Sequence, residues 1–306
     1  MQWVSGVSVG GWITPRLDEE WTIHHFVPHA YEAYARILHP TTRARPTSGE
    51  WPQEDDERAW ARFGAEIVEE PVTWAQTADA FGAEFAPTSR WGDVTGAWWG
   101  AFARDAQGWR YDPPEEGSVD ASLLAKIVSA LPGDDVFVAV WEGWGDLVGA
   151  MTSGIEGMPR RYADDEVPAE HRRLLDRIRL DPFNRPFGKP TWRPGVLSDE
   201  ISRGPRLSLP DRSHILFRGS LSELQDPEWA THVPWVAQGD EWPHSPSVLW
   251  PQDRSWFLST EVDHDYTVVG GSRAVIDALL GAEGIETQEL PEDADLSREP
   301  GSTGGE

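Results

Sequence analysis

The sequence predicts an α+β protein: a mixed, largely antiparallel sheet with helices packed on it and long polar insertions. Three observations point to this class. Residues 136–141 (VFVAVW) form a continuous apolar run, as expected of a central strand buried on both faces. Short apolar segments follow one another in the C-terminal third, which is typical of strands joined by turns. Two capped helical patterns accompany them, at residues 118–131 and 272–281.

The helices are predicted from apolar spacing and from end signals. In the first, apolar residues recur at positions 119, 123, 127 and 131, Ser118 is the expected N-cap, and Pro132 ends the pattern. In the second, Ser272 is the expected N-cap. A shorter helix is predicted at residues 73–81, with Thr73 as its N-cap and Gly82 as its end signal.

The strands are predicted from short runs of apolar, β-branched and aromatic residues. In the C-terminal part these are HILFRG, SWFLSTEVD, YTVVGG and IETQEL, at residues 214–219, 255–263, 266–271 and 285–290. Near the N-terminus, the apolar run bracketed by Pro28 and Pro40 fits a strand better than a short helix.

Composition divides the chain into four segments. These are an N-terminal α+β half (1–150), a Pro/Arg-rich connecting segment (151–205), a C-terminal α+β half (206–291) and an acidic, Gly-rich tail (292–306) that we expect to be disordered. Residues 41–70 are polar and acid-rich, and we expect an exposed insertion there. The sequence leaves open whether the two halves share one core and which oligomeric state the chain adopts.

Charge restricts the partners. The chain carries 52 acidic and 26 basic residues, a formal net charge of −26. Such a surface is repelled by nucleic-acid backbones and by anionic membranes, so neither is expected as a partner. A basic protein, a cation and a neutral ligand stay open as partners, and the charge can also serve solubility alone. No segment has the roughly 18 apolar residues of a membrane span, and no signal peptide is recognisable. There is no cysteine, which fits a reducing compartment, and we expect a cytoplasmic location.

The stretch from Ser255 to Ser272 is the strongest candidate for chemistry. On a straight strand, Glu261, Asp263 and Asp265 would share one face, where three carboxylates repel one another unless a cation such as Ca²⁺ or Mg²⁺ bridges them. The alternative, which we favour, is that residues 263–266 form a hairpin turn, since aspartate stabilises turns through its side chain.

Further candidates follow the central strand. Glu142 lies between two indoles at the strand end, where burial would raise the pKa of a carboxyl and suit it to general acid catalysis. Trp144 and Trp250 stand beside glycine or proline in predicted loops, where they either fill the ends of the core, which we favour, or bind a ligand. His25 and His29 have helical spacing, but Pro28 between them disfavours a helix, so no metal site is assigned. No cofactor is predicted.

The segments YEAYARILHP, VFVAVWEGWG and SPSVLWPQDRSWFLSTEVDHDYTVVGGS resemble an uncharacterised group of Trp-rich hypothetical bacterial proteins. The resemblance covers most of the chain outside the two polar insertions. It implies no activity, so it assigns no residue a role.

The leading hypothesis is a soluble, non-catalytic acidic protein that binds a partner, of the immunity or regulatory kind. The alternative is an enzyme acting on a small molecule or carbohydrate through a carboxylate cluster. The two differ in one geometric respect: the enzyme needs Glu142, Glu261 and Asp263 to converge in one cleft lined by Trp144 and Trp250.

Overall fold

The main element of the fold is a nine-stranded antiparallel sheet, which makes the protein α+β as predicted. The computed structural model describes residues 1–48, 50–52, 57–98, 100–145, 147–151, 192–240 and 242–297. The strand order is β1-β11-β7-β12-β13-β14-β2-β15, and β10 pairs with the first residues of β11. The strands are β1 (Gln2–Trp3), β2 (Ala33–Leu38), β7 (Asp135–Trp141), β10 (Leu207–Leu209), β11 (Arg212–Ser220), β12 (Val248–Pro251), β13 (Trp256–Ser259), β14 (Tyr266–Gly271) and β15 (Thr287–Leu290).

Strands from both halves of the sequence alternate in this sheet. β7 lies between β11 and β12, and β2 lies between β14 and β15. The two halves therefore contribute to a single sheet and to the hydrophobic clusters on both of its faces. β7 is central and almost completely buried, as its apolar run predicts: Val138 has no exposed surface and stands opposite Phe217 on one side and Leu249 on the other.

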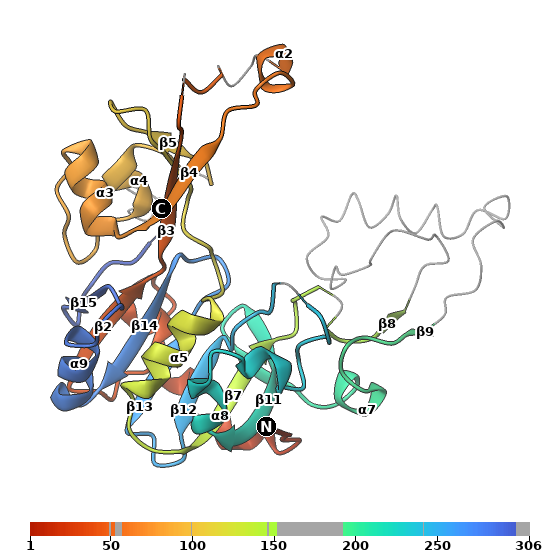
Figure 1. The fold of residues 1–306 in the computed structure, drawn as a ribbon. Coiled ribbons are helices and arrows are strands. Elements are labelled where there is room, and N and C mark those ends of the chain that lie inside the picture. The colour runs from red at the N-terminus through yellow and green to blue at the C-terminus, as the bar shows by residue number, and fades with distance from the viewer. Residues whose placement is uncertain are drawn as a thin grey trace, which may run out of the picture.

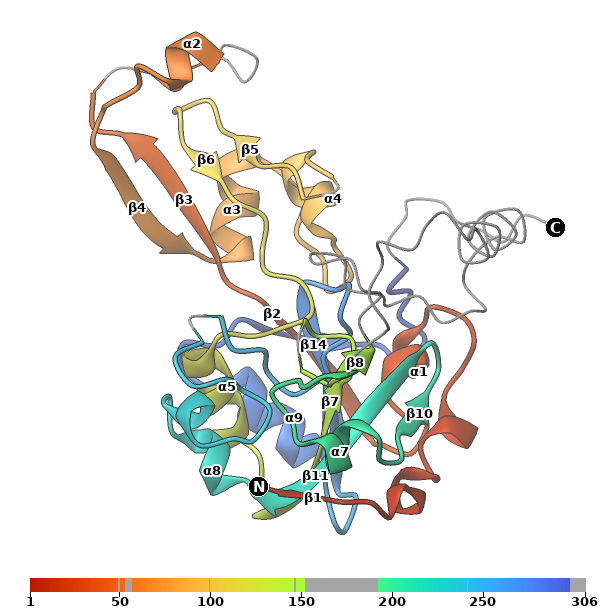
Figure 2. The same cartoon turned by 90° about the vertical axis from the view of Figure 1, so that its right-hand side faces the viewer.

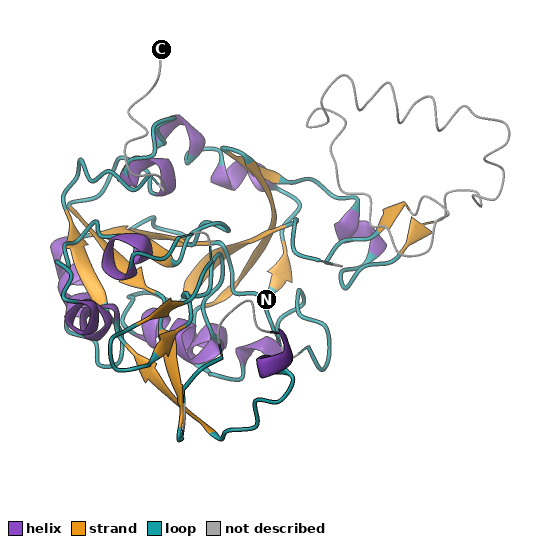
Figure 3. Cartoon of the chain, turned by 90° about the horizontal axis from the view of Figure 1, so that it is seen from above, coloured by secondary structure: helices purple, strands orange, loops and turns teal. Residues whose placement is uncertain are grey.

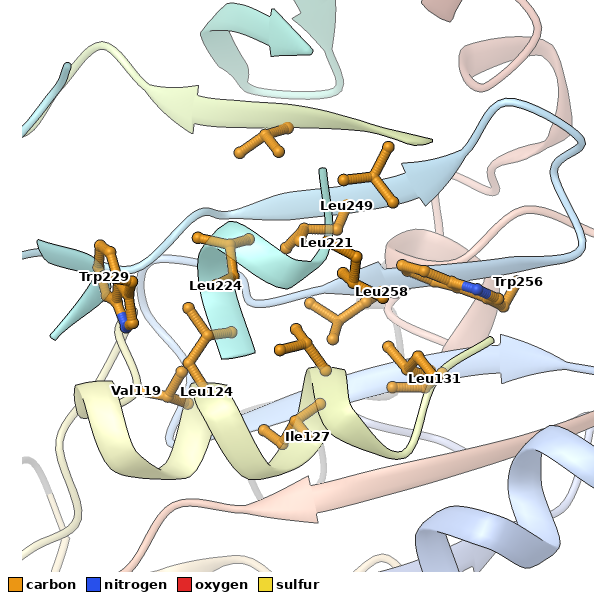
Figure 4. Close-up of a cluster of buried hydrophobic side chains, with 14 of the residues drawn as sticks. Val119, Leu124, Ile127, Leu131, Leu221, Leu224, Trp229, Leu249, Trp256 and Leu258 are labelled. Carbon is orange, nitrogen blue, oxygen red and sulfur yellow. The ribbon is translucent and has the colours of Figure 1, made fainter. Parts of the chain in front are cut away.

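One face of the sheet is covered by three helices, α5 (Ala121–Ser129), α8 (Ser222–Gln225) and α9 (Arg273–Leu280). Figure 4 shows Leu124 of α5 pointing toward Leu224 of α8, and Ile127 of α5 and Leu258 of β13 belong to the same buried cluster. The Ser272 side chain accepts a hydrogen bond from the Val275 N–H, so the predicted cap of α9 is confirmed. The cap of α5 is Asp120, not Ser118, because the carboxylate accepts from two N–H groups of the first turn.

The other face is covered by the N-terminal segment, including α1 (Ile23–Phe26), and the same hydrophobic cluster continues into an arm formed by residues 41–111. The arm holds a second antiparallel sheet, β4-β3-β6-β5, and rises from the end of β2 (Figures 1 and 2). Its elements are β3 (Thr41–Pro46), α2 (Glu57–Trp60), β4 (Ile67–Val72), α3 (Trp74–Phe81), α4 (Trp91–Thr95), β5 (Ala103–Arg104) and β6 (Arg110–Tyr111).

The arm corrects the expectation that residues 41–70 are only an exposed insertion, because both ends of that segment are strands. The predicted helix at 73–81 is present, with a capping box formed by Thr73 and Gln76. The Glu286 carboxylate accepts hydrogen bonds from the Trp74 and Ala75 N–H groups, and this contact holds the start of α3 against the main sheet.

The connecting segment is described only at its ends. There the short strands β8 (Ala150–Met151) and β9 (Trp192–Arg193) pair with each other, and α7 (Asp199–Ser202) follows. Figures 1 and 3 place this ribbon on the side of the molecule away from α9. Residues 152–191, with most of the Arg-rich region, lie outside the described residues. In the described ranges, every helix is too short or too polar to cross a membrane.

The start of the C-terminal tail corrects the sequence-based expectation of disorder. Ala294 and Leu296 are buried, and the Leu296 carbonyl accepts a hydrogen bond from the Tyr266 hydroxyl. Residues 292–297 are therefore packed against the body, while residues 298–306 lie outside the described part of the chain.

Candidate functional site

The acidic stretch is the loop of a hairpin between β13 and β14. The two strands pair in antiparallel register, so the predicted hairpin is confirmed, but its loop is longer than expected and runs from residue 260 to residue 265. The turn is stabilised by Glu261, whose side chain accepts from the Asp263 N–H at 2.6 Å and whose carbonyl accepts from the His264 N–H.

An arginine holds the carboxylates of the loop together. Arg212, at the start of β11, donates from Nε to Glu261 at 3.0 Å and from Nη2 to Asp263 at 2.6 Å. Burial alone would raise the pKa of Glu261, but the neighbouring His264 ring, the Asp263 N–H and the Arg212 charge outweigh it and lower this pKa to about 2. The Arg212 guanidinium thus offsets the repulsion between these carboxylates. The sequence had suggested a metal cation as one way to offset it.

Asp265 is in a different environment. Burial raises its pKa to about 6, and this effect is only partly offset by the charges of His264 and Arg36. It lines a small cavity of about 80 Å³ on the arm side of the loop, together with Arg90 and Tyr266.

A larger pocket of about 250 Å³ lies on the other side of the loop. Trp21 forms one wall and is stacked between His25, at 4.2 Å between ring centroids, and His264, at 5.6 Å. Glu261 and Arg212 also line this pocket. Trp21 is 42% exposed, so the indole forms part of the outer surface as well.

The pocket also contains a buried histidine. His214 is 3% exposed, and burial lowers its pKa to about 4, so its ring is neutral at pH 7. Its Nδ1 has no hydrogen-bond partner in the described part of the chain. No serine or threonine hydroxyl in the described residues forms a hydrogen bond with His214, so the described pocket contains no nucleophile–base pair of the kind that hydrolases use.

The other predicted site residues lie elsewhere. Glu142 does not line this pocket; its carboxylate accepts from Arg206 Nε at 2.8 Å. Trp144 is half-buried and stacks on His244 at 3.7 Å, beside a separate pocket. Trp250 is 1% exposed in the core, where it stacks on Phe137. Of the five predicted residues, only Glu261 and Asp263 come together.

Several residues of the pocket could not be recognised from the sequence. Arg212 is separated from Glu261 by 49 positions, and only the tertiary fold brings them into contact. Trp21 stands in an irregular N-terminal segment with no periodic pattern. The one available signal was charge: an arginine beside a turn in a strongly acidic chain needs a carboxylate partner.

A cluster of carboxylates borders the pocket at Trp21. Two distant segments are paired here: Thr22 forms an isolated β-bridge with Asp295, the Ile23 N–H donates to the Ala294 carbonyl, and the Leu296 N–H donates to the Trp21 carbonyl. We call the carboxylates of these two segments the acidic ridge. It consists of Asp18, Glu19, Glu20, Glu292, Asp293 and Asp295.

The acidic ridge is poorly neutralised. Five of its residues are exposed and Asp18 is half-buried. Among the described residues, His29 is the sole basic side chain in ion-pairing distance of any of the six, through Asp18 at 2.9 Å. The ridge therefore presents concentrated negative charge next to an exposed indole.

Comparison of the chain with protein-family models, curated proteins and solved structures gives no match.

Proposed function

We propose that this chain is a non-catalytic interaction protein that binds a basic protein partner through the acidic ridge and Trp21. The observation that carries the proposal is the position of the 42%-exposed indole at the edge of six almost unpaired carboxylates. Interfaces with lasting affinity combine a large, partly buried aromatic side chain with a charged rim. Tryptophan supplies apolar contact area, and the carboxylates supply attraction and orientation.

The charge of the whole chain supports the same partner. At −26, its long-range field attracts a basic protein and accelerates the encounter, while it disfavours acidic partners. A cytoplasmic location and a role of the immunity or regulatory kind, in which an acidic protein masks a basic one, belong to the same proposal. The enzyme alternative receives less support, since Arg212 and Arg206 already occupy the carboxylates on which it depends.

The test compares two variants with the same change of charge. The ridge variant carries Glu19→Gln, Glu20→Gln and Asp293→Asn. The control variant carries Glu66→Gln, Glu84→Gln and Asp79→Asn, three exposed carboxylates of the arm. Each protein and the wild type are immobilised and exposed to cytosol of the source cells, and the bound proteins are quantified by mass spectrometry.

We expect a protein of high isoelectric point to be retained by the wild type and by the control variant and to be lost with the ridge variant. The proposal fails if the ridge and control variants retain the same proteins in the same amounts, or if the proteins that the ridge mutations release are acidic.

A further inference from the structure

Two histidines that the sequence does not pair lie against each other beneath the acidic ridge. The rings of His24 and His29 stack with their centroids 3.5 Å apart. Thr22 caps α1 by accepting from the His24 N–H, and the His24 side chain is buried, with 3% of the residue exposed. The carboxylate of Glu292 reaches the pair from the docked tail, so that one ligand atom from each of the three residues lies within 4.8 Å of the other two.

The hydrogen bonds of both rings fix where their lone pairs lie. His24 Nδ1 lies 3.1 Å from the Val27 carbonyl, which can only accept, so Nδ1 carries the proton. The remaining nitrogen, Nε2, is therefore an acceptor, and it is buried with no hydrogen-bond partner in the described residues. A buried acceptor without a partner costs free energy unless a ligand satisfies it.

His29 is arranged in the same way. Its Nε2 lies 2.9 Å and 3.0 Å from the two carboxylate oxygens of Asp18 and donates to them. Nδ1 of this ring is left as the lone-pair nitrogen. A backbone carbonyl or a carboxylate on the far nitrogen is the usual support of a metal-bound histidine, because it fixes the tautomer and the orientation of the ring.

We propose that His24, His29 and Glu292 form a binding site for a transition-metal ion of the zinc type. Two imidazoles and one carboxylate suit Zn²⁺, whereas Ca²⁺ and Mg²⁺ prefer oxygen ligands alone. Asp18 and the Val27 carbonyl support the two rings. Water completes the tetrahedron.

The distances require only local movement. Ligand atoms at about 2.0–2.2 Å from a tetrahedral zinc ion are roughly 3.3 Å from one another. The three atoms here are at most 4.8 Å apart, and His29 and Glu292 are exposed. Because the two rings are stacked face to face, the His29 ring and its Asp18 partner must turn before the lone pairs of both rings point at one ion. Binding would link the N-terminal segment to residues 292–297, which belong to the other end of the chain. The metal would thus lock the two segments that form the acidic ridge.

The experiment uses the full chain without an affinity tag. Zinc content after equilibrium dialysis is measured by elemental analysis, and affinity by calorimetric titration with ZnCl₂, with MgCl₂ as the comparison ion. The test variants are His29→Gln and Glu292→Gln, both at exposed positions. The matched controls are His232→Gln and Glu283→Gln, which are exposed and lie outside the cluster.

We expect one zinc ion per chain, no comparable binding of magnesium, and a dissociation constant at least about tenfold higher in each test variant but unchanged in the controls. Zinc should also slow hydrogen exchange of the Ile23 and Leu296 amides, which join the two segments, in the wild type but not in Glu292→Gln. The proposal is overturned if zinc does not bind stoichiometrically, if both test variants bind it as the wild type does, or if these amides exchange at the same rate with and without it.

Discussion

Arg212 donates one hydrogen bond from Nε to Glu261 across 49 positions of sequence, at 3.0 Å, and a second from Nη2 to Asp263 in the same loop, at 2.6 Å. This contact joins the start of β11 to the β13–β14 loop at the pocket. Glu261 is mostly buried, so loss of the guanidinium leaves a carboxylate without its counter-charge in a place where water cannot replace it.

We therefore expect Arg212→Gln to lower the free energy of unfolding by about 1–3 kcal/mol in urea titrations. Arg218→Gln is the control, since it removes an ion pair with Asp135 in which both side chains are about half exposed, and it should change stability little. Equal effects of the two variants would contradict the structural role assigned to Arg212.

The pH dependence of stability should reflect the buried histidines. Burial lowers the pKa of His39 to about 4, below its ordinary value of 6.5, despite a hydrogen bond to the Glu115 carbonyl and the nearby charge of Asp120. The unfolded state binds the His39 proton more tightly than the folded state does. The free energy of unfolding is therefore highest above pH 6.5, and it decreases as the pH falls toward 4. His214 acts in the same direction.

Asp265 acts in the opposite direction over part of this range. Its pKa is raised from the ordinary value of 3.8 to about 6, so the folded state binds this proton more tightly than the unfolded state does. The resulting stabilisation is complete below pH 3.8 and is lost as the pH rises through 6. The effect of His39 is therefore measured by comparison: the free energy of unfolding is determined for the wild type and for His39→Gln between pH 7.5 and pH 4.5. The wild type should lose more stability with falling pH, by up to about 1.4 kcal/mol per unit. Parallel profiles would show that His39 is not held neutral.

The central strand should not tolerate charge. Val138 has no exposed surface, and Val138→Asp would bury a carboxylate with no counter-charge. We expect loss of the cooperative unfolding transition and of soluble expression. Val68→Asp, in β4 and 42% exposed, is the matched control and should leave the circular dichroism spectrum unchanged. A folded Val138→Asp protein would mean that β7 is not the centre of the sheet.

The docked tail should contribute measurably to stability. Leu296 is 4% exposed, and Leu296→Ala should lower the free energy of unfolding by about 2 kcal/mol or more, as for other buried leucines. Leu280→Ala, at a position 40% exposed on α9, should cost much less. If the two variants melt at the same temperature, residues 292–297 do not pack as described.

Local signals predicted those elements that depend on local interactions. The apolar run of β7 and the caps Thr73 and Ser272 were recognisable because each is complete within a few residues of sequence. The strands of the arm were missed because they carry alternating charges and prolines, such as Arg43, Arg45 and Pro46, and lack the apolar pattern of a half-buried strand.

The site was less predictable than the fold, because long-range pairings build it. The hairpin and its acidic loop were predicted correctly, and a cation was considered as the partner of the loop carboxylates. The observed partner is Arg212, which a local pattern cannot reveal because it lies 49 residues away. Likewise, Trp21 lies beside the acidic residues 292–295 because Thr22 pairs with Asp295, and these segments stand at opposite ends of the chain. Disorder was predicted for residues 292–297 because the tail as a whole is acidic and rich in glycine. The average composition conceals the two apolar residues, Ala294 and Leu296, that anchor this segment in the core.

The most direct test of the proposed function is the salt dependence of partner binding. The dissociation constant of the captured basic protein is measured by calorimetry at about 50 mM and about 300 mM NaCl for the wild type, the ridge variant and the control variant. Salt screens exposed charges, so the wild type and the control should lose at least about tenfold in affinity, while the ridge variant should bind weakly at both concentrations. Affinity that does not change with salt, or that survives in the ridge variant, would show that the acidic ridge does not bind the partner.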